Sequence, residues 1–180
     1  MHYSASSTNR QVTGIPLGHL MTSNGQPCSC CAPRTEPDRS SANGCPRCEV
    51  PSNRLVQAVT LRALLNGPEQ GLVSRPEYRL CTNRACPVVY FDPEGGAVFT
   101  KDQVSVRVGF KETGDPRPLC YCFDHSWESI EKEWLATGRS TAVASIRGSI
   151  RSTGCRCEET NPMGICCLAD VAKALEQIQG

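Results

Sequence analysis

The sequence predicts an α+β fold in which a small β-rich unit is followed by a small helical unit. Short β-branched and aromatic runs lie in the first half of the chain, and apolar residues recur at helical spacing in the second. Thirteen cysteines, most of them in close pairs, are spread over both halves. We expect a disordered tail over residues 1–43, a β-rich unit over residues 44–114 and a helical unit over residues 115–180.

The expected tail is rich in Ser, Asn, Thr, Pro and Gly and has no sustained apolar periodicity. Such a segment cannot bury enough apolar surface to offset the entropy that it loses on ordering. It contains Cys28, Cys30 and Cys31. Two interpretations of these thiols stay open, namely incidental free thiols and a weak site for a soft metal.

Turn residues and β-branched runs define the elements of the β-rich unit. Residues 55–59 are expected to be extended, and residues 60–65 to form a short helix that ends at residues 66–67, Asn-Gly. Residues 87–92 are β-branched and aromatic, which predicts a strand. Valines alternate with polar residues over residues 104–110, which predicts another strand.

Three helices are expected in the helical unit. Ser126 is a suitable N-cap for a helix that ends at Gly138. A second helix is predicted over residues 140–151 and is stopped by Gly154. The third helix follows Cys167 and runs to the chain end. We interpret the apolar stripes of these helices as ordinary core packing.

The cysteine pattern indicates metal binding rather than a disulfide framework. The total is odd, and neighbours such as Cys166 and Cys167 are poor disulfide partners because a bridge needs a specific geometry. The first residues are polar and contain no signal-peptide core. Thiolates that hold metal are typical of a reducing compartment, so we expect a cytoplasmic protein.

Several functional classes are not favoured by the composition. No apolar run approaches the length of about 20 residues that spans a membrane. The net charge of +1 lacks the basic field of a nucleic-acid-binding protein. His125 is interpreted as a capping or surface residue, and the other two histidines lie in the expected tail. The sequence predicts no hydrolase or transferase site, and at most a metal-reducing electron-transfer protein.

Two cysteine knuckles lie in the β-rich unit. Two residues separate Cys45 from Cys48, and four separate Cys81 from Cys86. Four converging thiolates suit a tetrahedral Zn²⁺ ion, although iron in a rubredoxin-like site would use the same ligands. A structural zinc contributes about 10–16 kcal/mol of binding free energy, enough to support a unit with a small apolar core.

The cysteines of the helical unit indicate a second, different centre. Two ligands lie on one loop and two near another, an arrangement that can hold a [2Fe-2S] cluster, in which each iron takes two thiolates. The expected ligands are Cys120, Cys122, Cys155 and Cys167. Cys157 or Cys166 remains an alternative to Cys167 as the fourth ligand.

Three arginines, Arg147, Arg151 and Arg156, lie near the expected cluster ligands in the sequence. Positive groups and backbone N–H groups favour the more negative, reduced form of a cluster. The sequence leaves two interpretations open, because the same arginines are equally suited to be solvated surface charges.

Four motifs resemble those of the amino-terminal domain of CopZ-type copper chaperones. They are Cys45-Pro-Arg-Cys48, Cys86-Pro-Val-Val-Tyr-Phe91, Leu119-Cys-Tyr-Cys-Phe123 and the run from Gly154-Cys-Arg-Cys157 to Cys167-Leu168. The resemblance covers residues 45–178. It implies a zinc ion, a [2Fe-2S] cluster in a fold similar to bacterioferritin-associated ferredoxin, and copper handling in which the cluster supplies an electron that converts Cu(II) to Cu(I).

The family also has a carboxy-terminal copper-binding domain with a Met-x-Cys-x-x-Cys loop, which this sequence does not contain. We therefore expect copper ions or a separate copper-binding chaperone as partners, with an unidentified electron donor. A thiol metallochaperone for Cu(I) or Hg(II), or a metal or redox sensor, remains the alternative function.

Overall fold

The computed structural model describes residues 43–180. The expected tail, with Cys28, Cys30 and Cys31, lies outside the described residues apart from its last position. Within the described part, no helix is both long enough and apolar enough to cross a membrane.

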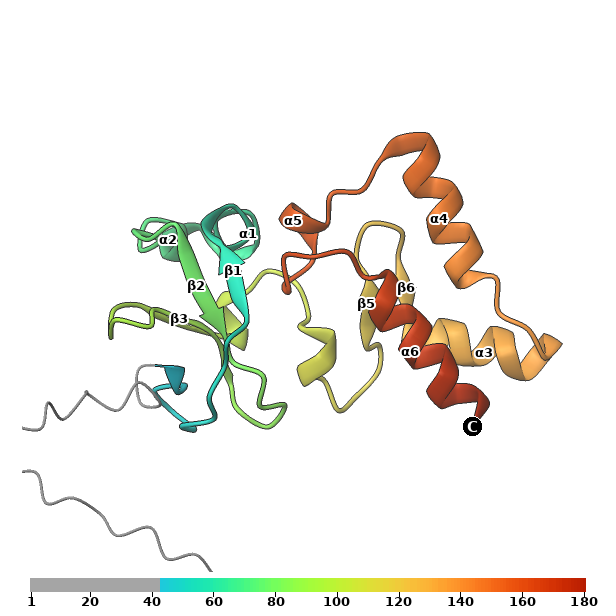
Figure 1. The fold of residues 1–180 in the computed structure, drawn as a ribbon, viewed down its shortest axis with the longest axis horizontal. Helices are drawn as coiled ribbons and strands as arrows, with labels where there is room; N and C mark the ends of the chain where they lie inside the picture. The colour runs from blue at the N-terminus through green and yellow to red at the C-terminus, as the bar shows by residue number, and fades with distance from the viewer. Residues whose placement is uncertain (1–42) are drawn as a thin grey trace, which may run out of the picture. The chain divides into compact units, whose positions relative to one another are not determined.

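Four short strands form one antiparallel sheet in the order β1-β2-β3-β4 (Figure 1). The strands are β1 Leu55–Gln57, β2 Glu77–Leu80, β3 Val88–Phe91 and β4 Val98–Thr100. The helices α1 Ala58–Leu64 and α2 Gly67–Gln70 lie between β1 and β2 in the chain. The sheet and α1 share one core, whose members include Val56, Leu61, Tyr78, Val89 and Phe99.

The predicted strand over residues 87–92 is confirmed as β3, and β3 is buried on both faces. Val89 and Tyr90 belong to the main core. Val88 and Phe91 belong to a separate small cluster that contains four cysteines. One strand therefore connects the core of the β-rich unit to a group of thiols.

The predicted strand over residues 104–110 is wrong, and β4 takes its place as the fourth strand of the sheet. Val104 makes only an isolated bridge with Leu65, and the chain then bends into a 3₁₀ turn, η3, over Gly109–Lys111. A Cβ atom at Gly109 would lie 1.8 Å from the carbonyl oxygen of Pro118. This close approach of two backbones needs glycine and bends the segment away from the sheet.

Beyond residue 115, two short strands and four helices follow. They are β5 Pro118–Cys120, β6 His125–Ser126, α3 Trp127–Thr137, α4 Ala142–Thr153, α5 Cys157–Thr160 and α6 Leu168–Gln179. Earlier in the chain, a 3₁₀ turn, η2 Lys101–Gln103, follows β4. The predicted N-cap is confirmed, because the Ser126 side chain accepts a 3.2 Å hydrogen bond from Ser129 N. Gly138 ends α3 with a φ of 67° and Gly154 ends α4, both as predicted.

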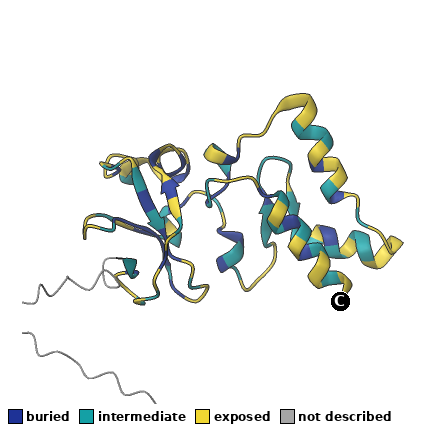
Figure 2. Cartoon of the chain, in the orientation of Figure 1, coloured by how far each residue is buried: buried dark blue, intermediate teal, exposed yellow. Residues whose placement is uncertain are grey.

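Helices α3, α4 and α6 pack on a second core formed by Ile130, Ile146 and Val171. Cys120 and Cys167 are buried in the same core. The outer sides of these helices are largely exposed (Figure 2). Two cysteines thus lie inside the helical core, as expected of ligands that hold a buried metal centre.

Helix α5 packs against α1, although the chain reaches it from the helical part. The Thr60 hydroxyl donates a 2.7 Å hydrogen bond to the carbonyl oxygen of Glu158. The buried Tyr90 hydroxyl donates another, also 2.7 Å long, to the carbonyl oxygen of Pro162. These bonds fix the backbone around Cys157 relative to the sheet.

Candidate metal centres

Four cysteines of the β-rich part converge. The sulfur atoms of Cys45, Cys48, Cys81 and Cys86 all lie within 4.8 Å of one another. The Sγ atoms of Cys45 and Cys86 are 3.9 Å apart, and those of Cys48 and Cys81 are 3.7 Å apart. A tetrahedral site with Zn–S bonds of about 2.3 Å places its sulfurs about 3.8 Å apart. The donor set therefore fits a tetrahedral metal ion.

Backbone hydrogen bonds position these four thiols. Cys45 and Cys48 lie on a tight turn, in which Glu49 N donates a 2.8 Å bond to the carbonyl oxygen of Cys45. Cys81 follows β2, and its N–H donates a 2.8 Å bond to the carbonyl oxygen of Val89. Because β2 and β3 are adjacent, the two cysteines of the second knuckle lie at the same end of the sheet.

Protons compete with metal at these buried thiols. Burial raises the pKa of Cys81 to about 12 and also raises the pKa of Cys86. Burial opposes ionisation of Cys48 as well, but hydrogen bonds from the Val50 backbone and the Asn83 side chain outweigh it and lower the pKa of Cys48 to about 7. A metal ion must therefore displace protons from most of the set.

Lys111 is a buried cation beside the four thiols, and only 3% of its surface is exposed. Its Nζ donates hydrogen bonds to the carbonyl oxygens of Asn83, at 2.6 Å, and Cys86, at 3.1 Å. Burial lowers the pKa of Lys111, while the charges of the four thiolates oppose that shift. Within residues 43–180 no carboxylate forms an ion pair with it. Sequence analysis missed this residue, since an isolated lysine carries no signal of burial.

The cysteines of the helical part form two close pairs rather than one group. The Sγ atoms of Cys122 and Cys157 are 3.6 Å apart. Cys120 and Cys167 are each 1% exposed, and a hydrogen bond from the Cys167 thiol lowers the pKa of Cys120 to about 7. Among the described residues these four sulfurs do not converge within 4.8 Å as the first four do. Two pairs of thiols fit a centre with two metal positions.

The structure brings Cys157, and not Cys155, into this arrangement. Cys155 is exposed, whereas Cys157 is 5% exposed. Gly154 ends α4 with a φ of 78° and an extended ψ, and Cys155 follows it at the surface. Cys157 begins α5 and is buried because α5 packs against α1. Of the expected set, the structure groups Cys120, Cys122 and Cys167. The fourth thiol of the group is Cys157, which the sequence analysis considered only as an alternative to Cys167.

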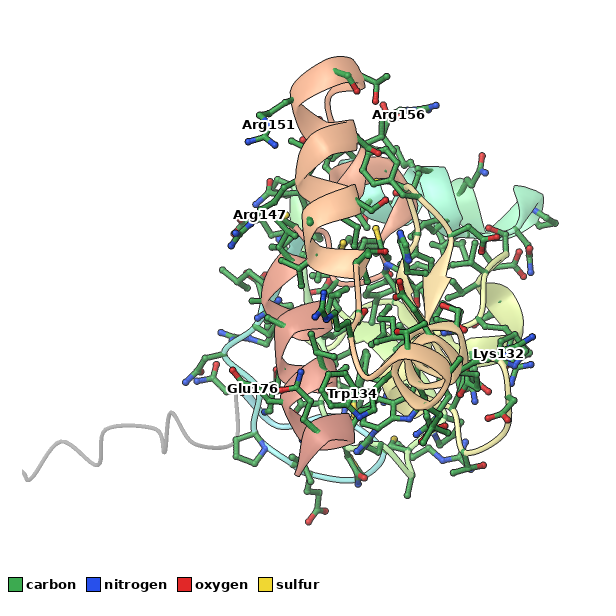
Figure 3. All side chains as sticks on the ribbon, turned by 90° about the vertical axis from the view of Figure 1, so that its right-hand side faces the viewer. Lys132, Trp134, Arg147, Arg151, Arg156 and Glu176 are labelled. Atoms are coloured by element: carbon green, nitrogen blue, oxygen red, sulfur yellow. The ribbon has the colours of Figure 1, made fainter. Side chains whose placement is uncertain are left out.

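The three arginines near this centre differ in their environments. The backbone N–H of Arg156 donates a 3.3 Å hydrogen bond to Cys122 Sγ, while its guanidinium pairs with Glu159 at 2.6 Å. Arg147 and Arg151 are exposed and project from α4 into open space (Figure 3). The backbone of Arg156, rather than an arginine side chain, thus makes the direct contact with a sulfur.

Comparison with known proteins identifies relatives of both parts of the chain. Residues 42–105 match a family of zinc-binding domains of CopZ. The copper chaperone CopZ of Archaeoglobus fulgidus is 33% identical over 125 residues, which cover 68% of this chain and 57% of that protein. The X-ray structure of the A. fulgidus CopZ amino-terminal domain matches with a TM-score of 0.60 at 29% identity, covering 72% of this chain and 95% of that domain. The chain thus spans little more than half the length of the curated relative that it matches.

Proposed function

We propose that this chain, which carries an amino-terminal domain of the CopZ type, is a metal-binding protein. In this proposal it takes part in copper handling and has two thiolate centres. The first centre holds zinc and the second a [2Fe-2S] cluster. The observation that carries this proposal is the difference between the two thiol groups. One converges on a single point, and the other consists of two close pairs.

The proposed ligands follow from burial and distance. Zinc is held by Cys45, Cys48, Cys81 and Cys86, whose sulfur separations suit tetrahedral coordination. The cluster is held by Cys120, Cys122, Cys157 and Cys167, with Cys157 in the place expected for Cys155. The zinc site supports the fold of the β-rich part, and the second site carries the redox function.

When bound, a [2Fe-2S] cluster supplies one electron, which converts Cu(II) to Cu(I) as one iron passes from ferrous to ferric, and an external one-electron donor restores the reduced form. The residues around the site support this role. The Arg156 N–H donates to Cys122 Sγ and so stabilises negative charge on that sulfur. Cys120 and Cys167 lie in the apolar core, which excludes water from one side. The copper ion would come from solution or from a separate copper-binding chaperone.

Metal and sulfide analysis of the anaerobically purified full chain tests both centres. We expect zinc, iron and acid-labile sulfide in a ratio of about 1:2:2, and an S = 1/2 EPR signal after reduction with dithionite. Two zinc ions without sulfide after anaerobic reconstitution would contradict the cluster and the electron-transfer role.

A matched pair of variants tests the ligand set. Cys157→Ser should lose most of the iron and sulfide, whereas Cys155→Ser should keep them, because only Cys157 is buried beside Cys122. The reverse result would restore Cys155 as a ligand. With reduced protein and a Cu(I)-specific chromophore, we expect about one Cu(I) per cluster oxidised, and none from Cys157→Ser.

A thiol metallochaperone is the second candidate function, and one observation favours it. Cys155 and Cys166 are exposed thiols that lie two residues before Cys157 and one residue before Cys167, respectively. Soft thiolates bind Cu(I) well. If these thiols capture Cu(I), the double variant Cys155→Ser/Cys166→Ser should lose stoichiometric Cu(I) binding in competition with bicinchoninate. Binding that survives in the double variant but is lost on deletion of residues 1–43 would assign capture to the tail cysteines.

A further inference from the structure

A cavity of about 310 Å³ has no cysteine among the described residues that line it. Its walls are mainly apolar and aromatic, with Leu80, Phe110, Trp127 and Met163 among them. Pockets that bind small molecules have volumes of about 300–1,000 Å³ and combine apolar walls with a few polar groups. The cavity is therefore large enough for a small organic ligand.

The charged side chains that line the cavity are predominantly cationic. Arg54, Arg84 and Lys173 form no ion pair within residues 43–180, and Asp170 is the one acidic residue of the lining. Arg117 also lines the cavity, but Glu128 neutralises it at 2.8 Å. Without a ligand, the lining has three unpaired cations and one unpaired anion.

Arg54 has an unsatisfied donor. Its Nη2 is buried and has no hydrogen-bond partner among the described residues. An unpaired buried donor costs about 1–3 kcal/mol, and such groups in native structures call for a bound ion, water or ligand. Arg84 is tied only through Nε, which donates a 2.8 Å bond to the carbonyl oxygen of Phe110. Its two terminal nitrogens remain free for an anion.

Two polar neighbours in the lining are already engaged. The Tyr121 hydroxyl accepts a 2.9 Å bond from Gly109 N and donates a 2.8 Å bond to the carbonyl oxygen of Arg107. The Asn161 side chain donates to one backbone carbonyl and accepts from a backbone N–H. Thr82 and Gln177 are the other uncharged polar side chains of the lining, and selection of negative charge falls to the guanidinium and ammonium groups.

We propose that this cavity binds a small organic anion that carries a doubly charged headgroup on an apolar or aromatic body. The headgroup meets Arg54, Arg84 and Lys173, and the body lies against Phe110 and the Trp127 ring. The guanidinium of Arg117 stacks 4.6 Å from the centre of that ring and stiffens this wall.

The cavity borders both groups of metal-binding residues. Leu80 and Thr82 line it on either side of Cys81, and Leu119 and Tyr121 line it on either side of Cys120. A bound anion would thus lie against the backbone that carries a ligand of each centre. The cavity therefore lies next to one cysteine-bearing segment of each thiol group.

Calorimetric titration of the metal-loaded full chain with 1-naphthyl phosphate tests the proposal. This probe joins an aromatic body to a dianion, whereas inorganic phosphate has only the charge and 1-naphthol only the ring. We expect one site per chain, and binding of each fragment at least about tenfold weaker, because a charged hydrogen bond and an apolar contact are each worth a factor of about ten or more. No detectable binding, or equally tight binding of either fragment, overturns the proposal.

Variants assign the binding to the cavity. Arg84→Gln and Lys173→Gln should each raise the dissociation constant about tenfold to hundredfold. Arg139→Gln is the matched control, since it removes the same charge from an exposed residue outside the lining and should leave binding unchanged. Equal affinities in all three variants overturn the location. If Arg84→Gln fails to fold, Lys173→Gln, at an exposed position of α6, still decides the test.

Discussion

Replacement of Lys111 by methionine should weaken zinc binding at the four-thiol centre. Burial keeps Cys81 and Cys86 protonated in the metal-free protein, whereas four thiolates around Zn²⁺ carry a net charge of −2, so metal binding makes the site more negative. A buried cation beside the site favours that change. Methionine keeps the length and apolar body of the side chain and removes the charge.

The expected size of the effect follows from the geometry. Lys111 Nζ lies 3.1 Å from the carbonyl oxygen of Cys86, which places it about 7 Å or less from the nearest sulfurs. At that separation, with an effective dielectric constant of about 20, a unit charge interacts with the −2 site by about 5 kcal/mol. Allowing for relaxation, we expect a loss of about 3 kcal/mol, which is about a hundredfold rise in the zinc dissociation constant.

Competition with a chromophoric chelator at pH 7.5 measures the zinc dissociation constant. Lys111→Arg keeps the charge and should recover most of the affinity, while Lys132→Met removes a charge from an exposed position of α3 and serves as the control. A Lys111→Met protein that is folded and binds zinc within about threefold of the wild type would refute the electrostatic reasoning.

Three further predictions concern stability and pH. Tyr90→Phe should lower the free energy of unfolding by about 1–3 kcal/mol in urea titrations, because it removes a buried 2.7 Å hydrogen bond; an unchanged midpoint would contradict this. Gly164→Ala should lower the free energy of unfolding by about 1–2 kcal/mol in the same assay, because φ is 65° and the new Cβ would lie 3.0 Å from Thr60 Oγ1. The control Gly148→Ala in α4 should not destabilise the protein, since a Cβ there meets no atom within 4 Å. Zinc affinity should rise by at least about a hundredfold per pH unit between pH 5.5 and 6.5. The pKa values of Cys48 and Cys81, about 7 and 12, leave both thiols protonated without metal, so that zinc must release both protons when it binds. A slope below tenfold per unit in chelator competition would refute this.

The convergence of the four thiols in the β-rich part was predictable from the sequence because each knuckle is a local feature. The turn between Cys45 and Cys48 and the loop between Cys81 and Cys86 each place two sulfurs close together, and pairing of β2 with β3 adds only one long-range requirement. The helices were predictable for the same reason, since caps such as Ser126 act within one turn.

Long-range contacts decided what the sequence could not. Cys155 and Cys157 are two residues apart, and the spacing pattern favoured Cys155 as a ligand because nothing local shows which of the two is buried. Docking of α5 on α1 buries one and leaves the other at the surface. The predicted strand over residues 104–110 failed for a similar reason, because the contact between Gly109 and Pro118 joins segments that no local pattern relates.

Strand β3 links the two proposed centres mechanically. Val88 and Phe91 pack with the four thiols of the first centre, whereas Tyr90, between them in the chain, lies in the main core and bonds to the carbonyl oxygen of Pro162. That bond holds the segment that follows Cys157, a proposed ligand of the second centre. A metal ion that orders the first site therefore also orders the strand that positions the second. In the function proposed above, a redox-inactive zinc ion would in this way support the second centre, because binding of a structural metal is coupled to the folding of the residues around it.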